Sequence, residues 1–305
     1  MNTAALLFLG FNGVALLMLP RRYALIPLLI GACYIPISQV IQVGPISFPA
    51  VRILIVIGLV RAAVRGERIV GGLNKLDWLL VAWAAWACFS SLFHEAGSIE
   101  NRLGMVCDYC GAYFLIRAFT TSINDVVLLS RSIAIVLGLV ALEMVYEHLS
   151  RTNLFSVFNQ IPLFPEIREG RVRASGPFEH AILAGTVGAA TLPLMIGAWR
   201  HFRRTAALGI VICLTMVIAS ASSSPIISAG CGVLALLAWR FRSRMRLVRC
   251  AAVVGYVALA IAMKAPVYYL LARIDVAGGS TGWHRARLIE AGIEHIGEWW
   301  LIGTD

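Results

Sequence analysis

Long apolar runs recur along the whole chain, and they constrain its fold more than any other feature. Each run of about 17–25 residues is long enough to cross the roughly 30 Å hydrocarbon core of a bilayer as a helix. Of the 305 residues, 59% are hydrophobic and only 14% are charged, whereas a soluble domain carries about 25% charged residues. The sequence therefore predicts an all-α, polytopic transmembrane protein.

We expect about ten transmembrane helices in a single membrane domain that covers residues 1–305. The apolar runs that predict them are 4–19, 24–42, 50–64, 76–93, 103–119, 126–145, 179–199, 205–221, 225–240 and 248–266.

The loops between these runs alternate in charge. Every second loop is rich in arginine, and together these loops hold 16 of the 26 Lys and Arg but only three acids, Glu67, Asp77 and Asp125. Short basic loops stay in the cytoplasm. The N-terminus and the two longest loops, 146–178 and 267–305, are therefore predicted to be extracytoplasmic. This arrangement accounts for the net charge of +10, so we expect a lipid bilayer and no nucleic acid as the partner.

Both long loops are expected to contain structure of their own. Residues 147–164 interleave aromatic, aliphatic and polar side chains, which is typical of a helix lying on the membrane surface. Residues 281–300 have apolar side chains near helical spacing, and Trp299 and Trp300 fit the aromatic belt of a membrane interface.

The first candidate site lies where the loop 146–178 re-enters the membrane. Arg171 and Arg173 precede a Gly-Pro turn and the start of an apolar run. Guanidinium groups and the N–H groups of a helix N-terminus both bind phosphate oxygens, so this pattern predicts a pocket for an anionic ligand. Outside the cytoplasm, the abundant phosphate-bearing substrate is lipid-linked, such as a polyprenyl diphosphate sugar. Alternatively, the two arginines pair with Glu166 and Glu169 or touch lipid head groups.

Two further groups of residues complete the candidate site. Arg285 and Arg287, in the other long loop, are expected to add to the pocket, with His284 or Glu290 as a polar partner; alternatively, they form the basic face of an interfacial helix. Glu179 and His180 head the apolar run after the first loop. Either is a candidate general base for an acceptor hydroxyl, or else caps and packs the helix.

We expect neither a metal nor a cofactor. Cys107 and Cys110 form a CxxC pattern inside an apolar run, with no second pair beside it. Zinc sites need four ligands, so we attribute these cysteines to helix packing. The chain also contains no Walker A motif and no GxGxxG motif, so the sequence predicts no direct use of ATP.

Several motifs in the C-terminal half resemble those of one family. RASGPFEHAILAG (residues 173–185) resembles the R-x-x-G-P-F-x-H/N…G helix entry of the O-antigen ligase and O-antigen polymerase (Wzy-like) family. Residues 222–225 resemble its Ser-rich turn, and residues 279–305 resemble its later S…R…W/A…P-L-x-G-x-G stretch. The chain is most similar in type to an exopolysaccharide polymerase.

The resemblance implies a GT-C-like, inverting glycosyltransferase in the bacterial inner membrane, which needs no metal. Such an enzyme moves an undecaprenyl-diphosphate-linked glycan onto an acceptor glycan (polymerase) or onto lipid A-core (ligase) at the extracytoplasmic face. The resemblance also implies that Arg173 and Arg285 hold the diphosphate and stabilise its leaving charge, while His180 matches a less strict family position.

The chain departs from the family pattern in two ways. Pro225 follows Ser224 where many members have an arginine, so we transfer no charge role to this turn. The family continues past this stretch with an outer-loop histidine, so we expect a C-terminally truncated member, and inactivity of this chain is an alternative expectation. Two other classes stay open: a transporter or flippase for a lipid-linked oligosaccharide, and a non-catalytic membrane subunit of a polysaccharide assembly complex.

Overall fold

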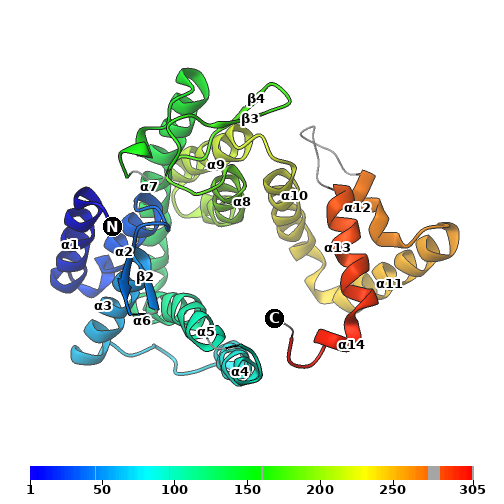
Figure 1. The fold of residues 1–305 in the computed structure, drawn as a ribbon, viewed down its shortest axis with the longest axis horizontal. Helices are drawn as coiled ribbons and strands as arrows, with labels where there is room; N and C mark the ends of the chain where they lie inside the picture. Colours follow the sequence, from blue (N-terminus) through cyan, green and yellow to red (C-terminus); the bar gives the residue numbers. More distant parts are fainter. Residues whose placement is uncertain (45, 96, 159–160, 274–281, 304–305) are drawn as a thin grey trace.

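The computed structural model describes the chain except for residues 45, 96, 159–160, 274–281 and 304–305. The fold is nearly all-α (Figure 1). The helices are Thr3–Met18 (α1), Leu25–Tyr34 (α2), Ala50–Val64 (α3), Lys75–Ser90 (α4), Ser98–Val106 (α5), Ala112–Phe119 (α6), Ile123–Ser150 (α7), Ala181–Gly197 (α8), Arg203–Ala219 (α9), Ser223–Ala238 (α10), Met245–Ala262 (α11), Leu270–Arg273 (α12), Gly282–Glu294 (α13) and Ile296–Trp299 (α14). The strands are Val40–Val43 (β1), Ile46–Pro49 (β2), Glu166–Arg168 (β3) and Arg171–Arg173 (β4), paired as two antiparallel hairpins.

Four helical segments are long and apolar enough to cross a membrane, which supports the prediction of a membrane protein. They cover Lys75–Phe93, Ile123–Ser150, Ala181–Arg200 and Ser223–Ala262. The last segment contains α10, a 3-10 turn and α11, and α1 is a shorter apolar helix. The finer prediction of about ten spans is not confirmed.

Two of the predicted elements are wrong. The run 24–42 is helical only to Tyr34, because Pro36 disfavours helical backbone in the residue before it, and residues 40–49 form the β1–β2 hairpin instead. The described residues of 147–164 also do not form the expected interfacial helix, since α7 continues to Ser150 and a 3-10 turn follows at Leu154–Phe158. The first long loop therefore begins at Arg151, whose positive φ of 57° ends α7. Helical structure within 281–300 is confirmed by α13 and α14.

Helices α7 to α10 pack as a bundle in which α9 lies between α7 and α8, and α8 lies between α9 and α10. Small residues on α8 permit this close packing: a Cβ on Gly188 would lie 2.8 Å from the carbonyl oxygen of Cys213 in α9. Such small residues are common where helices meet in membranes. After α10, the chain turns away from the bundle (Figure 1).

The bundle has two ends with different contents. At the end that we name the site end, Ala174 N donates to the carbonyl of Ala219 at 3.1 Å, which joins the first long loop to the end of α9. At the opposite end, which we name the arginine end, Arg131 of α7 lies over the ring of Phe202 at 5.2 Å. The bundle thus separates the first long loop from the basic turns between α8 and α9 and between α10 and α11.

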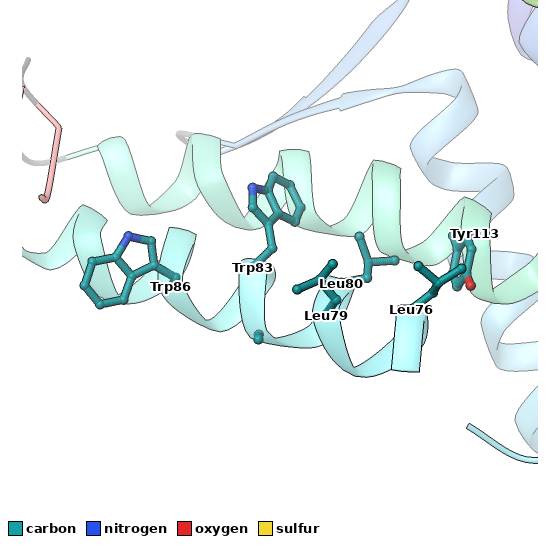
Figure 2. A pocket seen from close by; sticks show the side chains of 7 residues that line it. Leu76, Leu79, Leu80, Trp83, Trp86 and Tyr113 are labelled. Atoms are coloured by element: carbon teal, nitrogen blue, oxygen red, sulfur yellow. The ribbon is translucent and has the colours of Figure 1, made fainter. Parts of the chain in front are cut away.

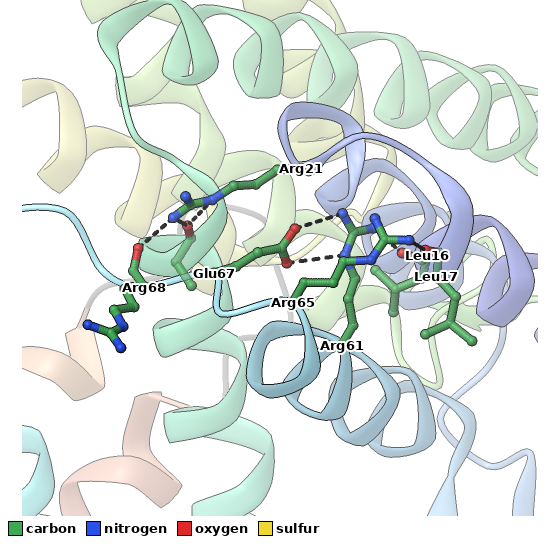
Figure 3. Close-up of polar contacts among 8 residues, drawn as sticks. Leu16, Leu17, Arg21, Arg61, Arg65, Glu67 and Arg68 are labelled. Carbon is green, nitrogen blue, oxygen red and sulfur yellow. Dashed lines mark hydrogen bonds and ion pairs between the residues drawn. The ribbon is translucent and has the colours of Figure 1, made fainter.

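Arginines in the N-terminal half join helix ends to one another (Figure 3). The fully buried side chain of Arg61 donates to the carbonyl of Leu16 and pairs with Glu67 at 3.0 Å. Arg65 donates to the last turn of α1 at 2.7 Å, and Arg21 Nε donates to the last turn of α6 at 2.9 Å. Because the last carbonyl groups of a helix have no partner within it, these arginines satisfy them.

Candidate functional site

The loop that carries the predicted site is anchored to the end of α7 by a buried carboxylate. Glu147 Oε2 accepts hydrogen bonds from the backbone N–H groups of Ser175 (2.9 Å) and Gly176 (2.8 Å). Asn153 Nδ2 donates to the carbonyl of Gly176 at 2.9 Å. Gly176 has a φ of +56°, and a Cβ there would lie 3.1 Å from Glu143 Oε2. Glycine is therefore favoured here by both backbone conformation and space.

The two arginines of the first motif lie on strand β4 but have different surroundings. The β3–β4 hairpin turns at Glu169 and Gly170, both with positive φ, as a tight two-residue hairpin turn requires. Arg173 is buried and pairs across the strands with Glu166 at 2.8 Å. The alternative expectation for Arg173, an ion pair with Glu166, is thus what the structure contains. Arg171 is exposed on the same strand.

Arg171 lines a pocket of about 640 Å³ at the site end of the bundle. His148, in the last turn of α7, and Arg151, directly after α7, line it as well. The other described residues that line it are Leu149, Gly170, Val172, Ile218, Ala221 and Ile226, none of which is acidic. Arginine stays protonated at all physiological pH values. The pocket therefore combines two fixed positive charges with an imidazole and an apolar wall.

The Ser-rich turn between α9 and α10 forms one side of this site. Ala221 lines the pocket and has a φ of 43°. On the neighbouring start of α10, Ser224 Oγ accepts a 2.6 Å hydrogen bond from Arg285 Nη2 of α13. The structure thus brings Arg285 to the turn in which the resemblance left an arginine missing.

The other predicted residues lie apart from this pocket. Arg287 pairs with Glu290 on its own helix and lies over the ring of Trp283 at 5.9 Å. Glu179 and His180 are exposed, with 4.0 Å between the Glu179 carboxylate and His180 Nε2. His180 occupies the N-cap position of α8 without a side-chain capping bond. None of these three residues lines the pocket.

The sequence interpretation missed the residues in the last turn of α7 and directly after it. Glu147, His148 and Arg151 fell in the segment 147–164, which was predicted to be a surface helix of its own. An acid just after a long apolar run, Glu147, was the available signal, because an acid that becomes buried there needs a hydrogen-bond donor nearby. The donors that it meets are 28 and 29 residues further along the chain.

A separate apolar hollow, larger than this pocket, lies on α4 beside Tyr113 of α6 (Figure 2). It measures about 760 Å³ and is lined by Leu76, Leu79, Leu80, Ala82, Trp83, Trp86 and Tyr113. None of these side chains is charged. This composition suits contact with lipid tails, and no predicted site residue lies there.

The described residues include no group of three or more His, Cys, Asp or Glu side chains placed to hold a metal. Cys107 and Cys110 lie in the π-helical turn Cys107–Gly111 between α5 and α6. Searches against known proteins returned no matching family model, curated protein or solved structure. The resemblance to the O-antigen ligase and polymerase family therefore stays a prediction based on its motifs.

Proposed function

We propose that this protein is a membrane glycosyltransferase of the O-antigen polymerase or ligase type. Its donor would be an undecaprenyl-diphosphate-linked glycan, and its acceptor another glycan or lipid A-core. The observation that carries the proposal is the pocket with Arg151, Arg171 and His148 at the site end of the bundle, bounded by helices that are apolar enough to lie in a membrane.

The composition of the pocket supports a donor that is both anionic and lipid-linked. Two guanidinium groups line the pocket, and none of its described lining residues is acidic, which favours a ligand with phosphate oxygens. Ile218, which is 72% exposed, forms part of the same pocket. A ligand with a phosphate group and an apolar chain would therefore be complementary to both the arginines and the apolar side chains of the pocket.

The proposed reaction is an inverting substitution at the anomeric carbon of the donor. The oxygen of the acceptor hydroxyl forms a bond to this carbon while the bond to the diphosphate breaks, and the lipid diphosphate leaves with the electron pair. Arg151 and Arg171 would stabilise its growing charge, because preorganised cations lower the barrier where charge develops. The hydroxyl proton passes to a base, for which His148 is a candidate in the pocket beside the predicted Glu179 and His180.

The remaining predicted arginines have supporting roles in this proposal. Arg173 holds the β3–β4 hairpin through Glu166, and Arg285 holds the turn at Ser224. Because Arg287 pairs with Glu290 on α13, it would meet the diphosphate only after that pair opens.

We further propose a GT-C-like arrangement in a bacterial inner membrane, with the site end outside the cytoplasm. The distribution of arginine supports this orientation. The basic turns around Arg200 and around residues 240–249 lie at the arginine end of the bundle, and short arginine-rich loops remain cytoplasmic. The N-terminus belongs with the site end, because Asn2 Nδ2 donates to the carbonyl of Val157 in the first long loop at 2.9 Å.

A reconstitution experiment tests this function. The full chain is purified into vesicles and supplied with a lipid-linked oligosaccharide, with or without lipid A-core and in the absence of ATP, and the products are sized by gel and mass spectrometry. Longer glycans are expected from a polymerase, and glycans on a new acceptor lipid from a ligase. Substrate that crosses the bilayer unchanged would contradict the proposal and support a flippase. Substrate that neither reacts nor crosses would support a non-catalytic subunit.

A further inference from the structure

Residues 239–249, which we name the arginine segment, form the most basic stretch of the chain. They contain Arg240, Arg242, Arg244, Arg246 and Arg249. The chain has no acid between Glu179 and Asp275. The arginine segment therefore has no counterion near it in the sequence.

The side chains of the arginine segment all face outward. Every residue from 239 to 249 is exposed, and α11, which begins within it, has no buried residue. Arg242 donates to the carbonyl of Trp239 and lies over its ring at 5.5 Å, while Arg249 Nε donates to the carbonyl of Met245 at 3.3 Å. Within the described part of the chain, none of its five arginines pairs with an acid.

Other arginines in the chain have a different environment, because they are bonded to acids or to the ends of helices. Arg61 is buried against Glu67 and the end of α1, and Arg21 donates to the end of α6 (Figure 3). Those arginines stabilise the fold through their head groups. The head groups of the arginine segment make no such tertiary contact with any other described residue, so we take their five charges to be available to a ligand.

The position of the arginine segment indicates where that ligand lies. The 16 residues of α10 separate the segment from the site end by about 24 Å, at about 1.5 Å per residue. This length is close to the thickness of a bilayer core. The segment also carries exposed Trp239 and Phe241, and aromatic side chains of this kind gather at the membrane–water interface.

We propose that the arginine segment binds the phosphate-bearing head groups of anionic phospholipids in the leaflet at the arginine end of the bundle. Clusters of basic residues beside a membrane-spanning helix attract such lipids. The interleaved aromatic side chains and the apolar helices on both sides favour a lipid surface over an acidic protein or a nucleic acid. This inference does not depend on the proposed enzymatic function.

The test measures lipid selectivity of the full chain. The chain is equilibrated with equal amounts of phosphatidylglycerol and phosphatidylcholine, and the lipids that it retains are counted by native mass spectrometry. The triple variant Arg242→Gln, Arg244→Gln, Arg246→Gln is compared with Arg200→Gln, Arg203→Gln, Arg204→Gln, which removes the same charge from exposed positions on another turn at the same end.

We expect the first variant to lose preference for phosphatidylglycerol by on the order of fivefold per arginine and the control to lose much less. Raising the salt concentration should weaken the preference of the unaltered chain, which tests the same claim without any variant. Unchanged selectivity in the first variant would overturn the proposal. Equal losses in the two variants would also overturn it, because they would reflect net charge alone. RNA binding is measured for the same proteins. If the first variant keeps its lipid selectivity but loses binding to an RNA that the unaltered chain binds, the proposal is overturned and the segment is assigned to a nucleic acid.

Discussion

Arg285 Nη2 donates a 2.6 Å hydrogen bond to Ser224 Oγ, across 61 residues of sequence. This contact joins α13 to the first turn of α10, next to the turn that helps to form the pocket. A guanidinium group that reaches the Ser-rich turn from another helix can hold that turn in place. The position of α13 is thereby coupled to the shape of the candidate site.

A double-mutant cycle measures this coupling. We expect Arg285→Ala and Ser224→Ala each to destabilise the protein, and the two effects to overlap by about 0.5–1.5 kcal/mol, because each removes the same hydrogen bond. The free energy of unfolding in detergent provides the measurement. Strictly additive effects would show that the bond contributes nothing.

Glu147→Ala should loosen the loop that carries the candidate site. The substitution leaves the N–H groups of Ser175 and Gly176 without their acceptor in a buried region, and each unsatisfied group costs about 1–3 kcal/mol. Glu147→Gln keeps an acceptor oxygen and should cost less. Exposed Glu179→Ala serves as the control. Thermal unfolding equal in Glu147→Ala and the control would contradict the anchoring role.

Gly176→Ala should destabilise the protein more than Gly170→Ala. Both positions have positive φ, so both substitutions carry a backbone cost of roughly 1–2 kcal/mol. A Cβ at position 176 would also crowd Glu143 and Met144 at 3.1 and 3.3 Å, whereas nothing lies within 4 Å of a Cβ at position 170. The difference in unfolding free energy between the variants isolates this crowding. Equal costs would mean that the loop moves away from α7 freely.

Removing Glu67 should be among the most damaging changes in the N-terminal half. Glu67→Ala leaves the fully buried Arg61 guanidinium without its carboxylate, and breaking a buried pair in this way costs roughly 3–5 kcal/mol. Arg65→Ala should cost much less, because Arg65 makes an exposed hydrogen bond to a carbonyl. The melting temperatures of the two variants check this prediction. A larger decrease in melting temperature for Arg65→Ala than for Glu67→Ala would contradict it.

Hydrophobicity was enough to predict the long apolar helices, because an apolar segment that crosses a membrane has to be helical to pair its own backbone groups. The runs at 76–93 and 126–145 correspond to α4 with its following turn and to α7. The prediction of a helix over 24–42 failed at its C-terminal end, because a short apolar segment such as VIQV (residues 40–43) can form either a strand or a helix. Pro36 was the signal that could have corrected it.

The candidate site was less predictable because its contacts are distant in sequence. The motif containing Arg171 and Arg173 lies in the loop that lines the pocket, but it did not indicate which arginine would be buried against Glu166. The pocket depends on Arg151, which enters it because α7 extends several residues past the predicted end of the apolar run at 145. Only the fold brings the end of α7 beside the hairpin and the α9–α10 turn.

Glycan transfer by Arg171→Ala, compared with Arg168→Ala, tests the proposed function most directly. The two arginines face each other in the β3–β4 register, and only Arg171 lines the pocket. With reconstituted full-length chain and lipid-linked oligosaccharide, we expect Arg171→Ala to lower the transfer rate by about 10²-fold or more, and Arg168→Ala to leave it nearly unchanged. Transfer at the unaltered rate in Arg171→Ala, or an equal loss in both variants, would contradict the assignment of this pocket as the diphosphate site.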